Sequence, residues 1–111
     1  MGLFAGETII FTRSIKKDFE GSHLSGQLIR SSSAAPLNYG EALGAESPKD
    51  FIHKNGIVLK ELKESRVCFK LLKHINYGED KARIKLLEEC EELIKIIATR
   101  IKNAKLKMNS K

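Results

Sequence analysis

A chain of 111 residues, 41% of them hydrophobic and 31% charged, is long enough for one domain around a single hydrophobic core. No apolar run approaches the ~20 residues that a membrane-spanning helix needs, and the N-terminus lacks the basic start of a signal peptide, so we expect a cytoplasmic protein without membrane contact. The net charge of +6 comes entirely from residues 93–111, which carry six basic and no acidic side chains, whereas residues 1–92 carry 14 of each.

The N-terminal segment predicts a short helix over residues 3–17. Residues at alternating spacings of four and three form one face, and they are Phe4, Thr8, Phe11 and Ile15. Residues 18–22 then predict a loop, because Gly21 favours a turn.

A second helix, kinked at Pro36, is predicted over residues 23–45. Its stripe consists of Leu24, Leu28, Ser31, Ala35, Asn38 and Ala42. Pro36 removes one backbone donor, and the small residues 31–35 before it allow a neighbouring helix to approach closely. Gly40 and Gly44 weaken the helical pattern, and their spacing indicates a helix contact more than a phosphate site.

The clearest signal along the chain is the start of a third helix, predicted over residues 47–75. Ser47 can cap its first turn, Pro48 suits the first helical position, and Asp50 favours the positive end of the helix dipole. The main stripe of this helix consists of Phe51, Asn55, Val58, Leu62, Ser65, Phe69 and Leu72. We expect that stripe to face the core.

A second stripe on the third helix predicts contacts between subunits. It lies about 120° from the first stripe. Its members are Ile57, Glu61, Glu64, Cys68, Leu71 and Ile75. A monomer of this size would struggle to cover two such faces, so we expect an oligomer. The residues predicted to form its interface are Ile57, Cys68, Leu71 and Ile75.

Charged residues on these helices predict a structural polar network. Its candidate members are Arg30, Glu41, Glu46, Glu61, Glu64 and Arg66. Because Glu61 and Glu64 interrupt the second stripe, burying them requires cationic partners, for which Arg30 and Arg66 are candidates. No nucleophile or metal pair accompanies these residues, so we favour a role in helix register or subunit contacts over catalysis.

A fourth helix is predicted over residues 80–106, and a basic C-terminal tail follows it. Its apolar stripe is Leu86, Leu87, Cys90, Leu93, Ile94, Ile97, Ile101 and Ala104. Two cysteines fit neither a disulfide framework nor a zinc site, so Cys68 and Cys90 are predicted to be buried free thiols. Four helices with short links and no strand pattern predict one all-α domain over residues 1–111, a rod-shaped antiparallel up-and-down four-helix bundle.

Four runs stand in a distinctive order between residues 18 and 69, and they read GQLIRSS, PLNYGEA, AESPKDFIHK and LKELKESR. In this order and spacing they resemble the four-helix bundle proteins encoded within intervening sequences of bacterial 23S ribosomal RNA genes. The resemblance implies a left-handed bundle, often a homopentamer, with no known enzymatic activity and no cofactor. A related protein, the accessory variability determinant of diversity-generating retroelements, binds nucleic acid and a reverse transcriptase, so the resemblance implies partners of both kinds.

Basic residues near the C-terminus are the candidate nucleic-acid contacts. They are Lys95, Arg100, Lys102, Lys105, Lys107 and Lys111. A ring of subunits would join them into an extended basic surface. An equally weighted interpretation is that these cations offset the negative end of the helix dipole and keep the protein soluble. Because Tyr39 and Tyr77 lie elsewhere in the sequence, we expect binding without base stacking.

Three function classes are compatible with these features. We favour a non-enzymatic oligomer that binds RNA or DNA through the basic surface, and the alternative is a structural scaffold for a protein partner. The third class is a magnesium-dependent enzyme, because Glu61 and Glu64 are followed by glutamates at positions 88, 89, 91 and 92. Glu88 and Glu92 are expected to face water, opposite the apolar stripe, so we predict no metal site.

Overall fold

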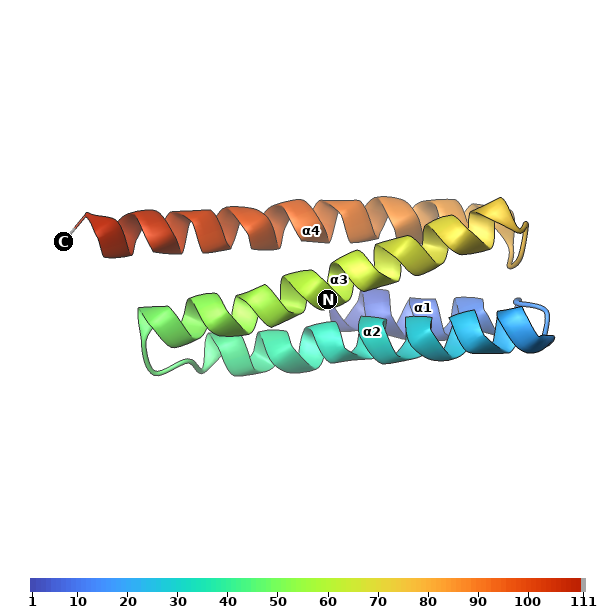
Figure 1. Ribbon diagram of the computed structural model, residues 1–111, viewed down its shortest axis with the longest axis horizontal. Coiled ribbons are helices and arrows are strands. Elements are labelled where there is room, and N and C mark those ends of the chain that lie inside the picture. The colour runs from blue at the N-terminus through green and yellow to red at the C-terminus, as the bar shows by residue number, and fades with distance from the viewer. Residues whose placement is uncertain (111) are drawn as a thin grey trace.

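The computed structural model describes residues 1–110, which form four helices: α1 (Gly2–Thr12), α2 (Phe19–Leu43), α3 (Pro48–His74) and α4 (Asp80–Asn109). No strand occurs in this range. The helices lie along one long axis, and the molecule measures 53 × 20 × 19 Å (Figure 1). The prediction of a rod-shaped, all-helical bundle is therefore confirmed. No helix within residues 1–110 is long and apolar enough to cross a membrane.

Each helix packs against its neighbours around the bundle. Helix α1 contacts α2 and α4, α2 contacts α3, and α3 contacts α4. In Figure 1 the chain runs from right to left along α2, from left to right along α3, and back to the left along α4. With 11 residues, α1 is less than half as long as any other helix, and it lies along only one half of α2 (Figure 1). The other half of the molecule consists of α2, α3 and α4 without a fourth helix.

The half that contains α1 holds an aromatic core. Phe4, Thr8, Phe11 and Ile15, which form the face predicted for the first helix, are all buried. The ring of Phe69 from α3 lies between two of them, with centroid distances of 6.4 Å to Phe4 and 5.9 Å to Phe11. Tilted and edge-on aromatic pairs of this kind add to the stabilisation that burial provides. The core therefore joins α1 to α3 across the bundle.

The stripes predicted for the longer helices also face the interior. The buried members are Leu28, Ser31, Ala35, Ala42, Asn55, Val58, Leu62, Ser65, Phe69, Leu72, Leu86, Cys90, Ile94 and Ile97. Two polar members of these stripes satisfy each other, because the hydroxyls of Ser31 and Ser65 lie 2.7 Å apart. Both cysteines are free and buried, as predicted. The thiol of Cys90 donates to the Leu62 carbonyl at 3.2 Å, and its burial raises the pKa to about 12.

The junction between α1 and α2 corrects the sequence-based boundaries. Helix α1 ends at Thr12 instead of residue 17, and α2 begins at Phe19, so the loop predicted for residues 18–22 is wrong. Asp18 explains the early start, because its carboxylate accepts a hydrogen bond of 2.8 Å from the Gly21 amide. A side-chain acceptor at this position satisfies a free amide of the first turn and so begins a helix. Beyond that start, α2 remains one helix across Pro36.

Hydrogen bonds tie the turn before α2 to the turn before α4. The hydroxyl of Tyr77 donates to the carboxylate of Asp18, and the amide of Glu79 donates to the Ser14 hydroxyl at 3.0 Å. The guanidinium of Arg83, which is buried, donates to the Tyr77 carbonyl at 2.9 Å. The bond from Tyr77 holds the pKa of Asp18 below its usual value, and the same bond raises the pKa of Tyr77 to about 12.

This link between the turns predicts how Tyr77→Phe changes stability with pH. Because the folded-state pKa of Asp18 is lowered, its contribution is present above the ordinary value of 3.8 and is lost as pH falls through the lower one. Because the pKa of Tyr77 is raised, its contribution is present below about pH 10, the ordinary tyrosine value, and is lost as pH rises through 12. The wild type should therefore exceed the variant in urea midpoint near neutral pH, and the difference should shrink at both extremes. Tyr39→Phe is the control, and a Tyr77→Phe difference that stays constant down to pH 2 would contradict the link.

Candidate nucleic-acid interface

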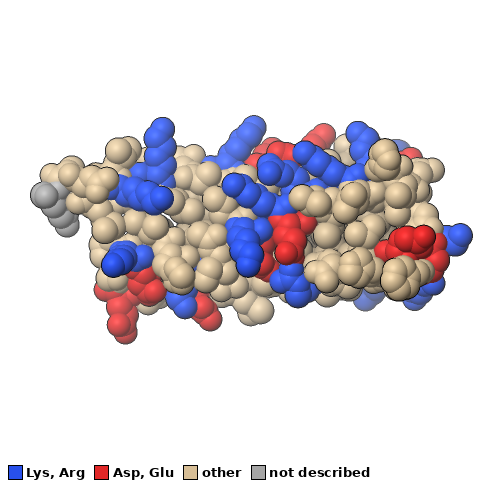
Figure 2. Space-filling model, viewed as in Figure 1, with Lys and Arg blue, Asp and Glu red and all other residues tan. Residues whose placement is uncertain are grey.

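The C-terminal half of α4 carries the cations that the sequence singled out. Glu79 begins this helix, since its carboxylate accepts hydrogen bonds from the amides of Lys81 and Ala82 at 3.2 and 2.7 Å. Five of the six candidate residues are described and exposed, and they are Lys95, Arg100, Lys102, Lys105 and Lys107. Lys111 lies outside the described residues. In Figure 2, Lys and Arg side chains project along the α4 edge of the molecule, including the half in which α4 ends.

These cations lie on two sides of α4. At about 100° per residue, Lys95, Lys102 and Lys105 share one side of the helix, whereas Arg100 and Lys107 share another. None of the four lysines forms an ion pair with a residue in the range 1–110. The acidic residues of α4 lie in its first half, so they do not neutralise the C-terminal part. Both sides therefore carry positive charge that is exposed to solvent.

A groove lies between the start of α3 and the end of α4, in the half of the molecule that α1 does not reach. It has a volume of about 650 Å³. A second hollow of about 760 Å³ adjoins it on the other side of the α4 end. Both are lined by Phe51, Ala104, Lys107 and Ser110. Phe51 is the first member of the main α3 stripe and is only partly buried, because no helix covers it here.

Aromatic side chains accompany the cations, contrary to the sequence-based expectation. The guanidinium of Arg100 lies 5.5 Å from the centroid of the Tyr39 ring and donates to its hydroxyl. Phe51 lies in the groove with Lys107. Tyr77 lies apart from them, beside Asp18. The sequence did not reveal this grouping, because Tyr39 and Phe51 reach the end of α4 only through the packing of three helices.

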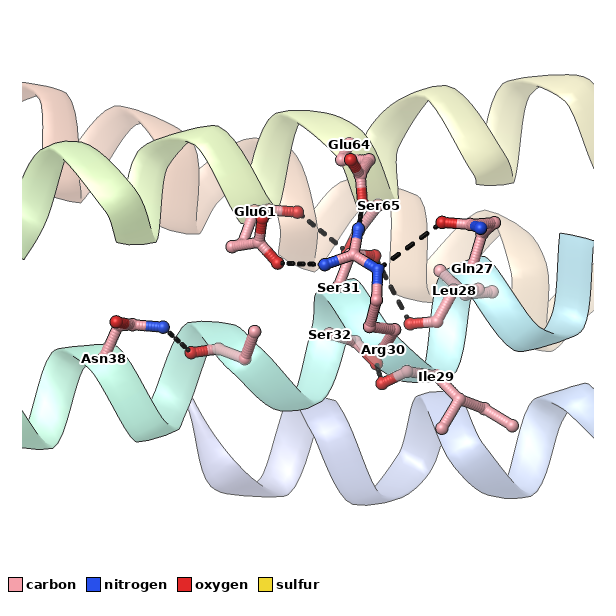
Figure 3. A network of polar contacts seen from close by, with 11 residues as sticks. Gln27, Leu28, Ile29, Arg30, Ser31, Ser32, Asn38, Glu61, Glu64 and Ser65 are labelled. Carbon is pink, nitrogen blue, oxygen red and sulfur yellow. Dashed lines mark hydrogen bonds and ion pairs between the residues drawn. The ribbon is translucent and has the colours of Figure 1, made fainter.

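The predicted polar network forms around one arginine between α2 and α3. Arg30 donates to the Glu61 carboxylate at 2.8 Å and also pairs with Glu64 (Figure 3). Its Nε lies 3.4 Å from the side-chain oxygen of Gln27. The Glu61 side chain is 7% exposed, whereas that of Arg30 is 49% exposed. A nearly buried carboxylate on α3 is thus neutralised by a half-exposed guanidinium on α2.

The other candidate members of the network lie apart from this cluster. Glu41 pairs with Lys54 at 3.0 Å, which forms a separate link between α2 and α3. Arg66 does not reach Glu61 or Glu64, and it lies 3.7 Å from Glu91 of α4. Glu46 is exposed at the end of the turn before α3. The structure therefore brings together Arg30, Glu61 and Glu64, and it separates Glu41, Glu46 and Arg66 from them.

The stripe predicted to contact other subunits is partly covered by its own chain. Cys68 is buried, and this burial raises the pKa of its thiol. Ile57 is partly buried, whereas Leu71 and Ile75 are exposed. The apolar surface that remains on this part of α3 consists of Leu71 and Ile75, with Val67 exposed nearby on the same helix.

The glutamates considered for a metal site do not converge. Glu88 and Glu92 are exposed, and Glu91 pairs with Arg66. Within residues 1–110, no group of three or more His, Cys, Asp or Glu side chains is placed to hold a metal ion.

Comparison with known proteins places the chain in a family. The model of the family described as 23S rRNA-intervening sequence protein matches residues 3–99. A similar crystal structure is that of a protein of unknown function from the S23 ribosomal protein family of Bacteroides thetaiotaomicron, which is 27% identical. The match covers 89% of this chain and 98% of that one, with a TM-score of 0.71. No curated protein matches the sequence.

Proposed function

Because the chain belongs to the 23S rRNA-intervening sequence protein family, we propose that it is a non-enzymatic, oligomeric helical bundle that binds RNA or DNA through the C-terminal half of α4. The observation that carries this proposal is the set of exposed lysines on that helix, at positions 95, 102, 105 and 107, none of which forms an ion pair with a residue between 1 and 110. Solvated cations on a rigid helix attract a phosphate backbone without reading its sequence.

The dependence of binding on salt tests this proposal. If one side of α4 neutralises three phosphates, affinity for structured RNA should fall roughly 40-fold between about 50 and 200 mM salt, because counterions are released on binding. Replacing Lys95, Lys102 and Lys105 together with alanine should lower the slope of log affinity against log salt by about 2.7. Fluorescence anisotropy with a labelled hairpin measures both quantities.

A matched control removes the same charge from another helix. Lys60, Lys63 and Lys70 are exposed on α3, so replacing these three with alanine lowers the net charge equally without touching α4. The salt slope should stay near the wild-type value. Equal losses in the two triple variants would mean that only net charge matters and would refute the α4 site. Absence of binding at low salt would favour a scaffold for a protein partner.

The proposed subunit is an antiparallel up-and-down bundle that assembles into a pentamer. We place this pentamer in the cytoplasm, and a reverse transcriptase is one kind of protein partner that it would bind. Exposed Leu71 and Ile75 support assembly, because apolar side chains on one helix gain free energy when a second copy covers them. Chromatography with light scattering measures the particle mass. A monomer at all concentrations would refute this part of the proposal.

A further inference from the structure

We propose that the groove between the start of α3 and the end of α4 accepts one unpaired nucleotide of the bound nucleic acid. This inference rests on the proposed function and adds a preference for nucleic acid with an unpaired base. The chain would bind a hairpin or duplex with an unpaired base more tightly than a perfectly paired one, because only an unpaired base can leave its stack and enter the groove.

The groove offers a surface on which a base can stack. Phe51 lines it together with apolar atoms of Ala104 and Met108. Every base has an aromatic face, so stacking on a protein ring does not depend on the base sequence. Phe51 is only partly buried, so part of its ring remains free of contact with the rest of the chain. The volume of about 650 Å³ falls within the ~300–1,000 Å³ of typical small-molecule sites.

Cations border the same groove, and they decide what kind of molecule fits. Lys49 at the start of α3 and Lys107 on α4 line it, and among residues 1–110 no acidic side chain does. Arg100 and Asn103 line the adjoining hollow. An apolar side chain from a second copy would leave these charges without partners, whereas a nucleotide places its phosphates against the lysines and its base against Phe51. Charge complementarity therefore favours a nucleotide.

The groove is also continuous with the proposed binding surface. Lys107 belongs both to the cations of α4 and to the lining of the groove. A strand held on the side of α4 that carries Arg100 and Lys107 would thus pass the opening of the groove. Tyr39 does not line the groove, and the guanidinium of Arg100 lies over its ring. Phe51 is the aromatic side chain that determines the expected preference.

The test compares two fluorescent RNA hairpins that differ only by one unpaired adenosine in the stem. Anisotropy titrations of the full chain at low salt should give about tenfold tighter binding to the hairpin with the unpaired base. Phe51→Leu keeps the apolar volume but removes the aromatic face, so the two hairpins should then bind equally. Phe51→Tyr should restore the preference. Phe19→Ala is the matched control, because Phe19 is an aromatic residue, 87% exposed, at the far end of α2.

The outcomes separate this inference from the proposed function. If wild-type protein binds both hairpins equally and with the expected salt dependence, the nucleotide groove is refuted and the basic surface stands. If it binds neither hairpin, the proposed function itself is refuted. A preference that survives in Phe51→Leu, with folding verified by circular dichroism, would also overturn the inference. The inference would also be overturned if the wild type showed no hairpin preference and Phe51→Leu had a lower particle mass. A second copy of the chain would then occupy the groove.

Discussion

Replacing Arg30 with alanine is expected to lower the free energy of unfolding by about 2–3 kcal/mol, because it leaves a buried carboxylate without its counter-charge. The Glu61 side chain is 7% exposed, and its contact with Arg30 is a hydrogen-bonded ion pair of 2.8 Å. Removing one partner of a fully buried pair costs about 3–5 kcal/mol. We expect a smaller loss here, because the half-exposed guanidinium lets water reach the carboxylate once it is removed.

Arg66→Ala is the matched control for this experiment. Arg66 lies 3.7 Å from a half-exposed Glu91, so its removal should cost less than about 1 kcal/mol. Urea unfolding followed by circular dichroism measures both variants. In the double variant Arg30→Ala, Glu61→Leu, where no buried charge remains, much of the lost stability should return. A single Arg30→Ala variant as stable as Arg66→Ala would show that the network contributes little.

The same variants also test the link between this network and assembly. Arg30 is half exposed, so part of its guanidinium remains available to a second subunit. If the pairing of Arg30 with Glu61 and Glu64 also positions subunit contacts, Arg30→Ala will have a lower particle mass than Arg66→Ala. Light scattering measures this difference. A change in stability without a change in mass would restrict the network to the subunit itself.

Helical periodicity predicted the interior of this protein well. Spacings of three and four identify the buried faces because one helical turn brings those positions onto one side. The pattern therefore identified Phe69 and Leu72 on α3, and Ile94 and Ile97 on α4, all of which are buried. It also identified the polar members Ser31 and Ser65, although not that they bond to each other.

Features that depend on which helices meet could not be predicted in the same way. The sequence suggested two partners for Glu61 and Glu64, but only Arg30 reaches them, since Arg66 lies toward α4 instead. Similarly, the groove at Phe51 exists because α1 is short and leaves that half of the molecule uncovered. Each of these depends on the relative register of separate helices, which periodicity within one helix does not contain.

Gly21→Ala is expected to destabilise the fold by about 3 kcal/mol or more. Gly21 is part of a helix, not of the loop that the sequence predicted. Gly21 lies in the first turn of α2, where its lack of a side chain permits close contact with the preceding turn. A Cβ atom there would overlap the carbonyl oxygen of Lys16 and lie 2.9 Å from its carbonyl carbon. Both atoms are backbone, so the overlap cannot be relieved by rotating a side chain.

Gly26→Ala separates this steric effect from the general effect of glycine in a helix. A Cβ atom at Gly26 meets nothing within 4 Å, so this variant should gain about 0.5–1 kcal/mol from the higher helix propensity of alanine. Thermal and urea unfolding of the two variants should thus shift in opposite directions. If Gly21→Ala is as stable as Gly26→Ala, the chain does not pass so closely before α2.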